Sequence, residues 1–183
     1  MKVIYRISDS GYNKVKPDYI NNENCLKNAV KEFKDAEWII IADDTSEETN
    51  HMLYKYTKTP FLKNVTIKYV SIGHGAGTFN IGLNEALKFD NEEIVYFIEN
   101  DYLHKPDSKK ILEEGFLLGA SFVSLYDHPD KYLDPSKGGN PYCKGNAEDT
   151  RVYLTDSVHW KITNSTTMTF AATVATLRDD ESI

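Results

Sequence analysis

The feature that most constrains the fold is a pair of short, uninterrupted apolar runs, at residues 38–42 and 94–98. Each run is followed at once by acidic side chains. Strands that are buried on both faces have this pattern, because helices cover both sides of a parallel sheet. A chain with two such strands therefore needs helices on both faces of one sheet.

Helix-like segments alternate with these runs and with other strand-like segments. Further strands are predicted at residues 3–7, 65–69 and 121–126, and two closing strands at residues 151–155 and 167–174. The apolar residues that recur at helical spacing between them are Leu26, Val30, Phe33, Met52, Leu53, Tyr56, Leu83, Ala86 and Leu87. This order predicts a three-layer α/β/α fold with a mainly parallel, mixed central sheet.

Capping residues and turn residues mark the ends of these segments. Asn22 or Asn24 is the expected N-cap of the first helix, and Ser46 is the expected N-cap of the second. Residues 127–150 are polar and rich in proline and glycine, which predicts a long surface loop. A loop of this length in a compact domain is usually functional or disordered.

Composition excludes several classes of protein. One domain accounts for the 183 residues, and the net charge of -7 argues against nucleic acid as a partner. Cys25 and Cys143 form no CxxC pair, which disfavours a zinc site or a disulfide framework. The sequence shows no secretory leader and no apolar run long enough to span a membrane, so we expect a cytoplasmic protein.

Two acidic clusters follow the two buried runs, Asp43-Asp44 after the first and Glu99-Asn100-Asp101 after the second. In open α/β sheets, ligands bind beyond the carboxyl ends of the strands. Glu99 and Asp101 alternate, so both carboxylates can face one cleft, where oxygen ligands suit Mg²⁺ or Mn²⁺ that bridges a diphosphate. The alternative is a solvated loop tip, but the meeting of several clusters at one sheet edge favours a binding site.

Three glycines, Gly73, Gly75 and Gly77, stand between a predicted strand and a predicted helix. Their spacing departs from the G-x-G-x-x-G dinucleotide fingerprint, and they follow the third strand instead of the first. We therefore favour a tight turn, or a close approach of the backbone to a phosphate.

Two histidines lie near these clusters or in the last third of the chain. His104 follows Asp101, and His159 is followed by Lys161. His159 is a candidate metal ligand, with a hydrogen-bonded structural role as the alternative. Lys161 is a candidate phosphate contact, because its ammonium group is a point charge.

Two segments resemble the family 2 glycosyltransferases, which have the nucleotide-diphospho-sugar transferase (GT-A) fold. Residues 39–49 are similar to the second strand of that family and its D-D-x-S element. Residues 96–101, with Pro106 and Asp107, resemble its D-x-D segment and the helix start that follows. Residues 5–171 are also similar to a narrower group that includes a viral capsid-modifying glycosyltransferase domain.

The resemblance implies roles for the residues of the two acidic clusters. Asp44 would contact the nucleobase of the donor, Glu99 would lie near the ribose, and Asp101 would ligate the metal. Asn100 stands where the family usually has a middle carboxylate.

The resemblance extends to the end of the first strand and to the glycine turn. Arg6, Ser8 and Asp9 would contact the base or the ribose. The turn and helix start from Gly75 to Asn80 would lie near the diphosphate, without the arginine that the family often has there.

The catalytic carboxylate of the family lies on a helix that follows a strand like residues 167–174. We expect the present sequence, which ends at Ile183, to be truncated before that helix. Asp179 and Asp180 are then the candidates for the catalytic base within the sequence.

These observations predict a metal-dependent glycosyltransferase, and we expect it to be of the inverting kind. We expect residues 1–126 to bind the nucleotide-sugar, a UDP-sugar first, and residues 127–183 to face a glycan or glycoprotein acceptor. Mn²⁺ or Mg²⁺ is the expected cofactor. Two alternatives stay open: a non-catalytic module that binds nucleotide-sugars, and a sugar nucleotidyltransferase, which is disfavoured because the first turn has few glycines.

Overall fold

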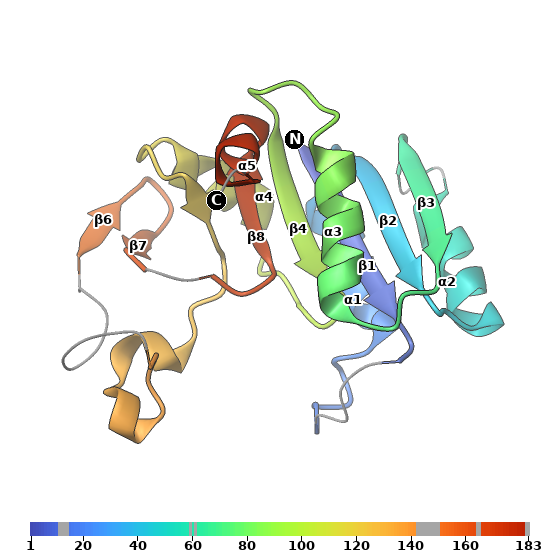
Figure 1. Ribbon diagram of the computed structural model, residues 1–183, viewed down its shortest axis with the longest axis horizontal. Helices are drawn as coiled ribbons and strands as arrows, with labels where there is room; N and C mark the ends of the chain where they lie inside the picture. Colours follow the sequence, from blue (N-terminus) through green and yellow to red (C-terminus); the bar gives the residue numbers. More distant parts are fainter. Residues whose placement is uncertain (11–14, 59, 61, 142–150, 164–165, 182–183) are drawn as a thin grey trace.

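The computed structural model describes residues 1–10, 15–58, 60, 62–141, 151–163 and 166–181. Six strands form one sheet in the order β3-β2-β1-β4-β8-β5, and two further strands form a separate antiparallel hairpin (Figure 1). The strands of the sheet are β1 (Lys2–Ser8), β2 (Glu37–Asp43), β3 (Val65–Val70), β4 (Ile94–Glu99), β5 (Phe122–Val123) and β8 (Phe170–Thr173). The hairpin consists of β6 (Val152–Leu154) and β7 (His159–Lys161).

The predicted mainly parallel, mixed sheet is confirmed. β1 runs parallel to β2 and to β4, and β2 runs parallel to β3. β8 runs antiparallel to both of its neighbours, β4 and β5. Ser8 is in register with Asp43, and Arg6 is in register with Glu99, so three parallel strands end at one edge of the sheet. We call this edge the carboxyl edge.

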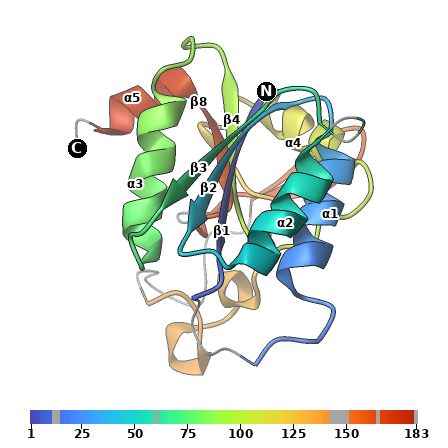
Figure 2. The ribbon, with the colours of Figure 1, turned by 90° about the vertical axis from the view of Figure 1, so that its right-hand side faces the viewer.

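Helices cover both faces of the sheet, as predicted (Figure 2). The helices are α1 (Asn22–Glu32), α2 (Glu47–Thr57), α3 (Gly75–Ala86), α4 (Ser108–Phe116) and α5 (Val174–Glu181), with the short 3-10 helices η1 (Pro129–Tyr132) and η2 (Pro135–Lys137). One buried cluster joins α1, α2 and α4 to the sheet, and the other joins α3 and α5 to its opposite face. Tyr5 belongs to the first cluster and its neighbour Ile4 to the second, because successive strand residues point to opposite faces.

The helix starts follow local capping chemistry. Ser46 caps α2 as predicted, with its side chain accepting a hydrogen bond of 3.2 Å from the backbone N–H of Thr49. The predicted cap of α1 is wrong by one or more positions, because Asn21 caps that helix through a bond of 2.9 Å from the Asn24 N–H. The Asn22 side chain instead donates a hydrogen bond to Asp9 and accepts one from Asn100.

The end of the chain departs from the prediction. The predicted strand at residues 167–174 is shorter, and Val174 already begins α5. The Thr173 hydroxyl explains this early start, because it accepts a hydrogen bond of 3.2 Å from the Thr176 N–H in the manner of an N-cap. A helix thus follows this strand at once, at Val174, and whether it corresponds to the helix with the catalytic carboxylate stays a prediction.

Two other segments differ from the prediction. The strand expected at residues 121–126 is limited to β5, and the strand expected at residues 151–155 pairs with β7 outside the central sheet. Segments on both sides of residue 126 contribute to one sheet, because β8 lies between β4 and β5.

The burial pattern of α4 gives a test of this arrangement. Leu112 is fully buried between α4 and the sheet, whereas Leu117 at the end of the same helix is 82% exposed. We expect Leu112→Ala to lower the free energy of unfolding by about 2–5 kcal/mol, the cost of a cavity in a packed core. Urea unfolding followed by circular dichroism measures this change. Leu117→Ala is the matched control and should stay within about 0.5 kcal/mol of the original protein; equal losses in both variants would contradict the packing of α4.

Candidate functional site

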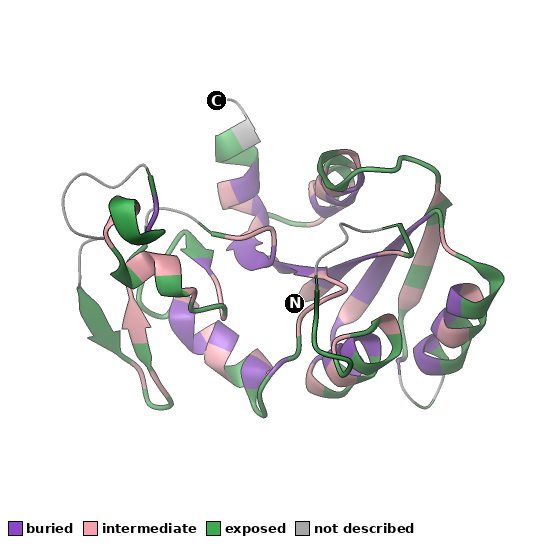
Figure 3. Ribbon diagram, turned by 90° about the horizontal axis from the view of Figure 1, so that it is seen from below, coloured by how far each residue is buried: buried purple, intermediate pink, exposed green. Residues whose placement is uncertain are grey.

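The candidate site lies at the carboxyl edge, where β1, β2 and β4 end. Figure 3 views the molecule from this side and shows exposed and half-buried segments around the ends of buried strands. The fold brings together here most of the predicted site residues: Arg6, Ser8, Asp9, Asp44, Gly75, Glu99, Asn100 and Asp101. The sequence could predict this convergence because parallel strands end on the same side of a sheet.

Arg6 lies beneath the edge and is only 5% exposed. Its Nη2 atom is 3.2 Å from Oε1 of Glu99, and its Nη1 atom donates to the carbonyl of Gly75 at 2.8 Å. Nη1 also lies 3.4 Å from the Thr78 hydroxyl. Burial lowers the pKa of Arg6, against the opposing charges of Glu99 and Asp101, but an arginine stays protonated in proteins. Arg6 thus supplies a fixed positive charge that joins β1, β4 and α3.

Asp43 and Asp44 are neighbours with different environments. Asp43 is buried, and its carboxylate accepts hydrogen bonds from the N–H groups of Ile72 at 2.6 Å and Gly73 at 3.0 Å. Asp44 is exposed, and its carboxylate makes no hydrogen bond or ion pair with another described residue. Its φ of 47° lies in the left-handed region, which non-glycine residues occupy at a cost and often at functional sites. Asp43 therefore holds the β3–α3 turn, and Asp44 presents a carboxylate to solvent.

The side chains of Asp9 and Ser8 form hydrogen bonds that stabilise the carboxyl edge. The Asp9 carboxylate accepts hydrogen bonds from the Ser46 N–H at 2.6 Å, from the Thr49 hydroxyl at 2.7 Å and from the Asn22 amide at 2.9 Å. Partial burial raises the pKa of Asp9, but these hydrogen bonds outweigh it and leave the pKa below its usual value. The Ser8 hydroxyl accepts a bond of 3.1 Å from the Ser10 N–H. Both side chains are thus bonded within the protein.

Asn100 shows why an amide stands between Glu99 and Asp101. Its Nδ2 atom donates to the Ser8 carbonyl at 3.1 Å and to the Asn22 side-chain oxygen at 2.6 Å. A carboxylate can only accept hydrogen bonds. An aspartate at position 100 could therefore not donate to the Ser8 carbonyl or to the Asn22 side-chain oxygen, and both hydrogen bonds would be lost. Asn100 therefore ties the end of β4 to β1 and α1.

Asp101 is the half-exposed carboxylate of the second acidic cluster. Its Oδ2 atom forms an ion pair of 2.8 Å with Lys16, a residue that no motif in the sequence singles out. Nowhere in the described ranges do three or more His, Cys, Asp or Glu side chains come close enough to hold a metal ion by themselves. Magnesium in nucleotide sites is commonly held by one or two carboxylates and by the phosphates of the substrate, and Asp101 fits that mode.

The start of α3 faces the same edge. His74 caps the helix, with its Nδ1 atom accepting a bond of 3.0 Å from the Gly77 N–H. Gly73 has a φ of 77°, and a Cβ on Gly77 would lie 2.4 Å from a methyl group of Ile72. The two glycines are therefore explained by a turn and by close packing, as favoured over the dinucleotide fingerprint. Asn80 is exposed on the first half of α3.

The remaining predicted site residues lie elsewhere. His159 and Lys161 are on β7, and Figures 1 and 3 show the β6–β7 hairpin at the opposite end of the molecule from β3. The Lys161 ammonium group lies 5.6 Å from the centre of the Tyr132 ring. Asp179 and Asp180 are on α5, which starts beside the amino end of β4, where the Val174 N–H bonds to the Glu93 carbonyl. α5 thus lies at the edge opposite the carboxyl edge, because β8 runs antiparallel to β4.

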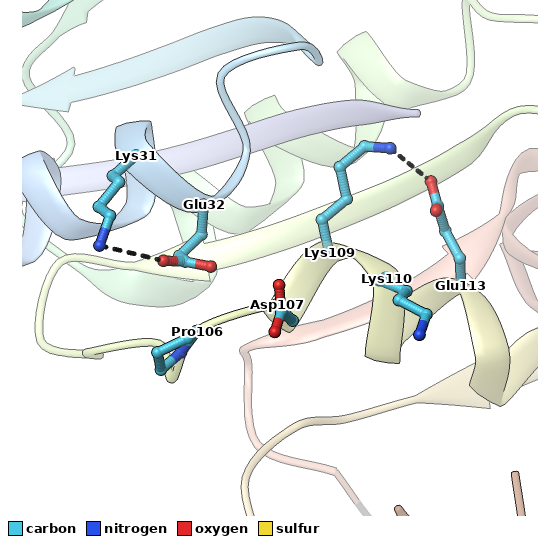
Figure 4. A pocket seen from close by; sticks show the side chains of 7 residues that line it. All are labelled: Lys31, Glu32, Pro106, Asp107, Lys109, Lys110 and Glu113. Carbon is cyan, nitrogen blue, oxygen red and sulfur yellow. Dashed lines mark hydrogen bonds and ion pairs between the residues drawn. The ribbon is translucent and has the colours of Figure 1, made fainter. Parts of the chain in front are cut away.

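A separate hollow of about 450 Å³ lies between α1 and α4 (Figure 4). It is lined by Lys31, Glu32, Pro106, Asp107, Lys109, Lys110 and Glu113. Its charges are largely matched within the protein, with Lys109 2.7 Å from Glu113 and Lys31 4.0 Å from Glu32. The hollow is not part of the carboxyl edge, and its lining calls for no further charged ligand.

His104 is a structural residue. It is buried between α1 and β4, and its Nε2 atom is 2.9 Å from the Tyr96 hydroxyl. Its backbone N–H donates to the Asn28 side chain at 2.6 Å. The ring also packs edge-on against Phe33 at 5.0 Å. Burial lowers the pKa of His104 to about 4, so the side chain is neutral near pH 7.

Comparisons with known protein families and with curated proteins find no significant match. Among solved structures, the chain is similar to Staphylococcus aureus TarS, residues 1–349, with a TM-score of 0.56 and 16% identity over 98% of this chain and 48% of the TarS chain. The chain thus spans about half the length of that structure.

Two other structures are similar at TM-scores of 0.48, too low to support an argument. One is the 4-diphosphocytidyl-2C-methyl-D-erythritol synthase of Anaerococcus prevotii, with 16% identity over 100% of this chain and 75% of that one. The other is the bifunctional glycosyltransferase WbbM, with 12% identity over 98% of this chain and 32% of that one. At these identities the comparisons show the fold alone.

The sheet order, the two helical layers and the similarity to TarS define a GT-A-like α/β/α fold with a mainly parallel, mixed sheet. The expected fold class is therefore confirmed.

No helix in the described ranges has the length and hydropathy that a membrane span needs.

The pKa of His104 predicts how stability depends on pH. A histidine in the unfolded chain takes up a proton near pH 6.5, whereas folded His104 does so only near pH 4. The unfolded state therefore binds more protons between these values, and the free energy of unfolding should fall as the pH drops from about 6.5 to about 4.

His104→Gln removes this titrating group, so the fall between pH 6.5 and pH 4 should become shallower. Urea unfolding at pH 7, 6 and 5 measures the slope. His51→Gln, at an exposed position of α2, controls for the loss of a histidine as such. A slope that is the same in His104→Gln and the original protein would contradict a neutral, buried His104.

Proposed function

We propose that the chain binds a nucleotide-diphospho-sugar, with a UDP-sugar as the first candidate, at the carboxyl edge and transfers its sugar to an acceptor hydroxyl. The observation that carries this proposal is the convergence of Asp44, Glu99 and Asp101 at one edge of a GT-A-like sheet, beside the start of α3. The similarity to TarS supports the fold but names no activity for this chain.

Different groups at the carboxyl edge would contact the base, the ribose and the diphosphate of the donor. The Asp44 carboxylate, exposed and held in a left-handed conformation, would accept the N–H of the nucleobase. Glu99 is 32% exposed at its side chain, and its contact with Arg6 fixes its position for a ribose hydroxyl. The N–H groups at the start of α3 would face the diphosphate, since a helix N-terminus favours anions.

Lys16 and Arg6 add positive charge to this acidic protein at the same edge. Lys16 lies 2.8 Å from Asp101, and both side chains are about one-third exposed, so a diphosphate can compete for the ammonium group. Arg6 lies deeper and provides a charge that does not move. The two cations would help to stabilise the negative charge of the leaving diphosphate.

We propose that Mn²⁺ or Mg²⁺ binds at Asp101 together with the phosphates of the donor. A bound divalent ion would neutralise charge on the leaving diphosphate. His159, predicted as a second ligand, lies on the distant β6–β7 hairpin and is not included in this proposal.

The transfer is proposed to invert the anomeric centre, with a carboxylate accepting the proton of the acceptor hydroxyl. Asp179 and Asp180 are not proposed as that base, because α5 lies at the opposite edge of the sheet. A non-catalytic nucleotide-sugar-binding module stays as the second candidate for this reason. The comparisons add no support for the narrower resemblance to the viral capsid-modifying domain.

A screen of nucleotide-sugars tests the proposal as a whole. Thermal unfolding with UDP-, dTDP- and GDP-sugars, each with and without Mn²⁺, should show a rise in the midpoint for at least one donor, because a ligand that binds the folded state stabilises it. Release of the nucleotide with a saccharide acceptor would establish transfer. Binding without turnover would favour the non-catalytic module, and no binding of any donor would contradict both.

Asp44→Ala tests the position of the nucleobase. We expect it to weaken UDP binding by about 1.5–3 kcal/mol, the range for a hydrogen bond to a charged group. Isothermal titration calorimetry measures the affinity. Glu48→Ala removes an exposed carboxylate from the first turn of α2 and is the matched control for charge. Unchanged UDP affinity in Asp44→Ala would show that the base lies elsewhere.

Asp101→Asn tests the proposed metal ligand while keeping the shape of the side chain. The increase in UDP affinity on adding Mn²⁺ should be lost, because an amide oxygen is a weaker ligand for a hard cation than a carboxylate. Calorimetry in Mn²⁺ and in EDTA measures this difference. Lys16→Ala is the companion variant, and it should keep or increase the effect of Mn²⁺ because Asp101 loses its ion pair. An undiminished effect of Mn²⁺ in Asp101→Asn would refute the assignment.

A further inference from the structure

Several aromatic side chains lie beyond the ends of β4 and β5, beside the candidate donor site. β5 runs antiparallel to β8, and β8 runs antiparallel to β4, so β5 and β4 point the same way. Thr169 joins the ends of these two strands. Its hydroxyl accepts the Glu99 N–H at 3.1 Å, and its carbonyl accepts the Ser124 hydroxyl at 3.2 Å. The residues after β5 therefore emerge at the carboxyl edge next to those after β4.

Three ring-to-ring contacts or side-chain hydrogen bonds link the aromatic residues from this point. Tyr102, next to Asp101 in the chain, packs edge-on against Tyr126 with ring centres 5.3 Å apart. Tyr126 in turn lies 5.3 Å from the ring of His128. Tyr132 follows on η1, and its hydroxyl donates to Asp127 at 2.8 Å. We call these residues, Tyr102, Tyr126, Asp127, His128 and Tyr132, the aromatic strip.

The strip is open to solvent beyond the carboxyl edge. Tyr126 is 41% exposed and Tyr132 is 50% exposed. Figures 1 and 2 show η1 and η2 extending below the sheet, on the side to which β1 and β2 point, and Figure 1 shows them under the β6–β7 hairpin. An acceptor on Tyr126 would lie beside the end of β4, where the donor sugar is proposed to be, because Tyr126 packs against Tyr102.

The chemistry of the strip matches a neutral sugar. Aromatic faces offer an apolar surface for the C–H groups of a pyranose ring, and a few placed polar groups fix the orientation of a ligand. Asp127 is such a group, and so is Asp130, whose Oδ1 atom lies 2.9 Å from Nδ1 of His128. The strip carries both signs of charge, because the Lys161 ammonium group lies 5.6 Å from the centre of the Tyr132 ring. The two carboxylates can accept hydrogen bonds from the hydroxyl groups of a sugar.

We propose that the aromatic strip is the acceptor site and that it binds an uncharged saccharide, with one sugar face on Tyr126 and hydroxyl groups on Asp127 and on the His128–Asp130 pair. This inference rests on the proposed glycosyltransferase function, but the site can be tested without turnover. It also names the residues through which part of the segment 127–183, expected from the sequence to face the acceptor, would bind it.

Saturation-transfer NMR with the full chain and three disaccharides, lactose, maltose and chitobiose, tests the proposal. At least one should bind, and Tyr126→Ala should weaken its binding at least tenfold. Tyr126→Phe keeps the ring and should stay within about threefold of the original protein. Tyr54→Ala, which removes a tyrosine that is 59% exposed on α2, is the matched control and should have no effect.

The outcomes separate this proposal from the donor site. UDP binding by Tyr126→Ala should equal that of the original protein, which also shows that the variant is folded. The strip is refuted if none of the disaccharides binds with or without UDP and Mn²⁺, if Tyr126→Ala binds as well as the original protein, or if Tyr54→Ala weakens binding equally. If saccharide binding depends on Tyr126 but no nucleotide-sugar binds, the proposed saccharide site is supported and the proposed donor function is rejected.

Discussion

The contact between Arg6 and Glu99 is the interaction on which the carboxyl edge depends. Arg6 on β1 holds the end of β4 through Glu99 and the start of α3 through the Gly75 carbonyl, so one buried guanidinium fixes three elements. A buried ion pair is not a large net source of stability, but removing one partner commonly costs about 3–5 kcal/mol, because the other charge is left uncompensated. Position 6 is therefore constrained by the fold as well as by any ligand, and the positive charge beneath the edge is permanent.

Around this contact, the polar residues of the edge divide into those that hold the structure and those that face solvent. Asp9, Asp43 and Asn100 each make two or more hydrogen bonds within the protein and so fix the turns after β1, β2 and β4. Asp44 lies beside the well-bonded Asp43 and stays exposed. This arrangement is typical of functional sites, where satisfied polar groups position a small number of available ones. The proposed contact with the nucleobase rests on this exposed carboxylate of Asp44.

The order of the strands explains why the proposed donor and acceptor sites are adjacent. β8 enters the sheet between β4 and β5 in the antiparallel direction, so β5 emerges beside β4 although the two strands are separated by α4 in the chain. The same reversal carries α5 to the opposite edge, with Asp179 and Asp180 on it. A single antiparallel strand thus decides which carboxylates lie near the site and which do not.

The sequence by itself determined the layers of the fold and the edge that carries the site. Continuous apolar strands at residues 38–42 and 94–98 require cover on both faces, and parallel strands place Asp44 and Asp101 on one side. Only the tertiary structure decided what each polar side chain does there. The direction of β8, the use of Asn100 as a donor between β1 and α1, and the ion pair of Lys16 with Asp101 all join residues 78 or more positions apart, or depend on which strand lies beside which. Local patterns of hydropathy and capping carry no information about such long-range pairings, because the pairings arise only when the strands have packed.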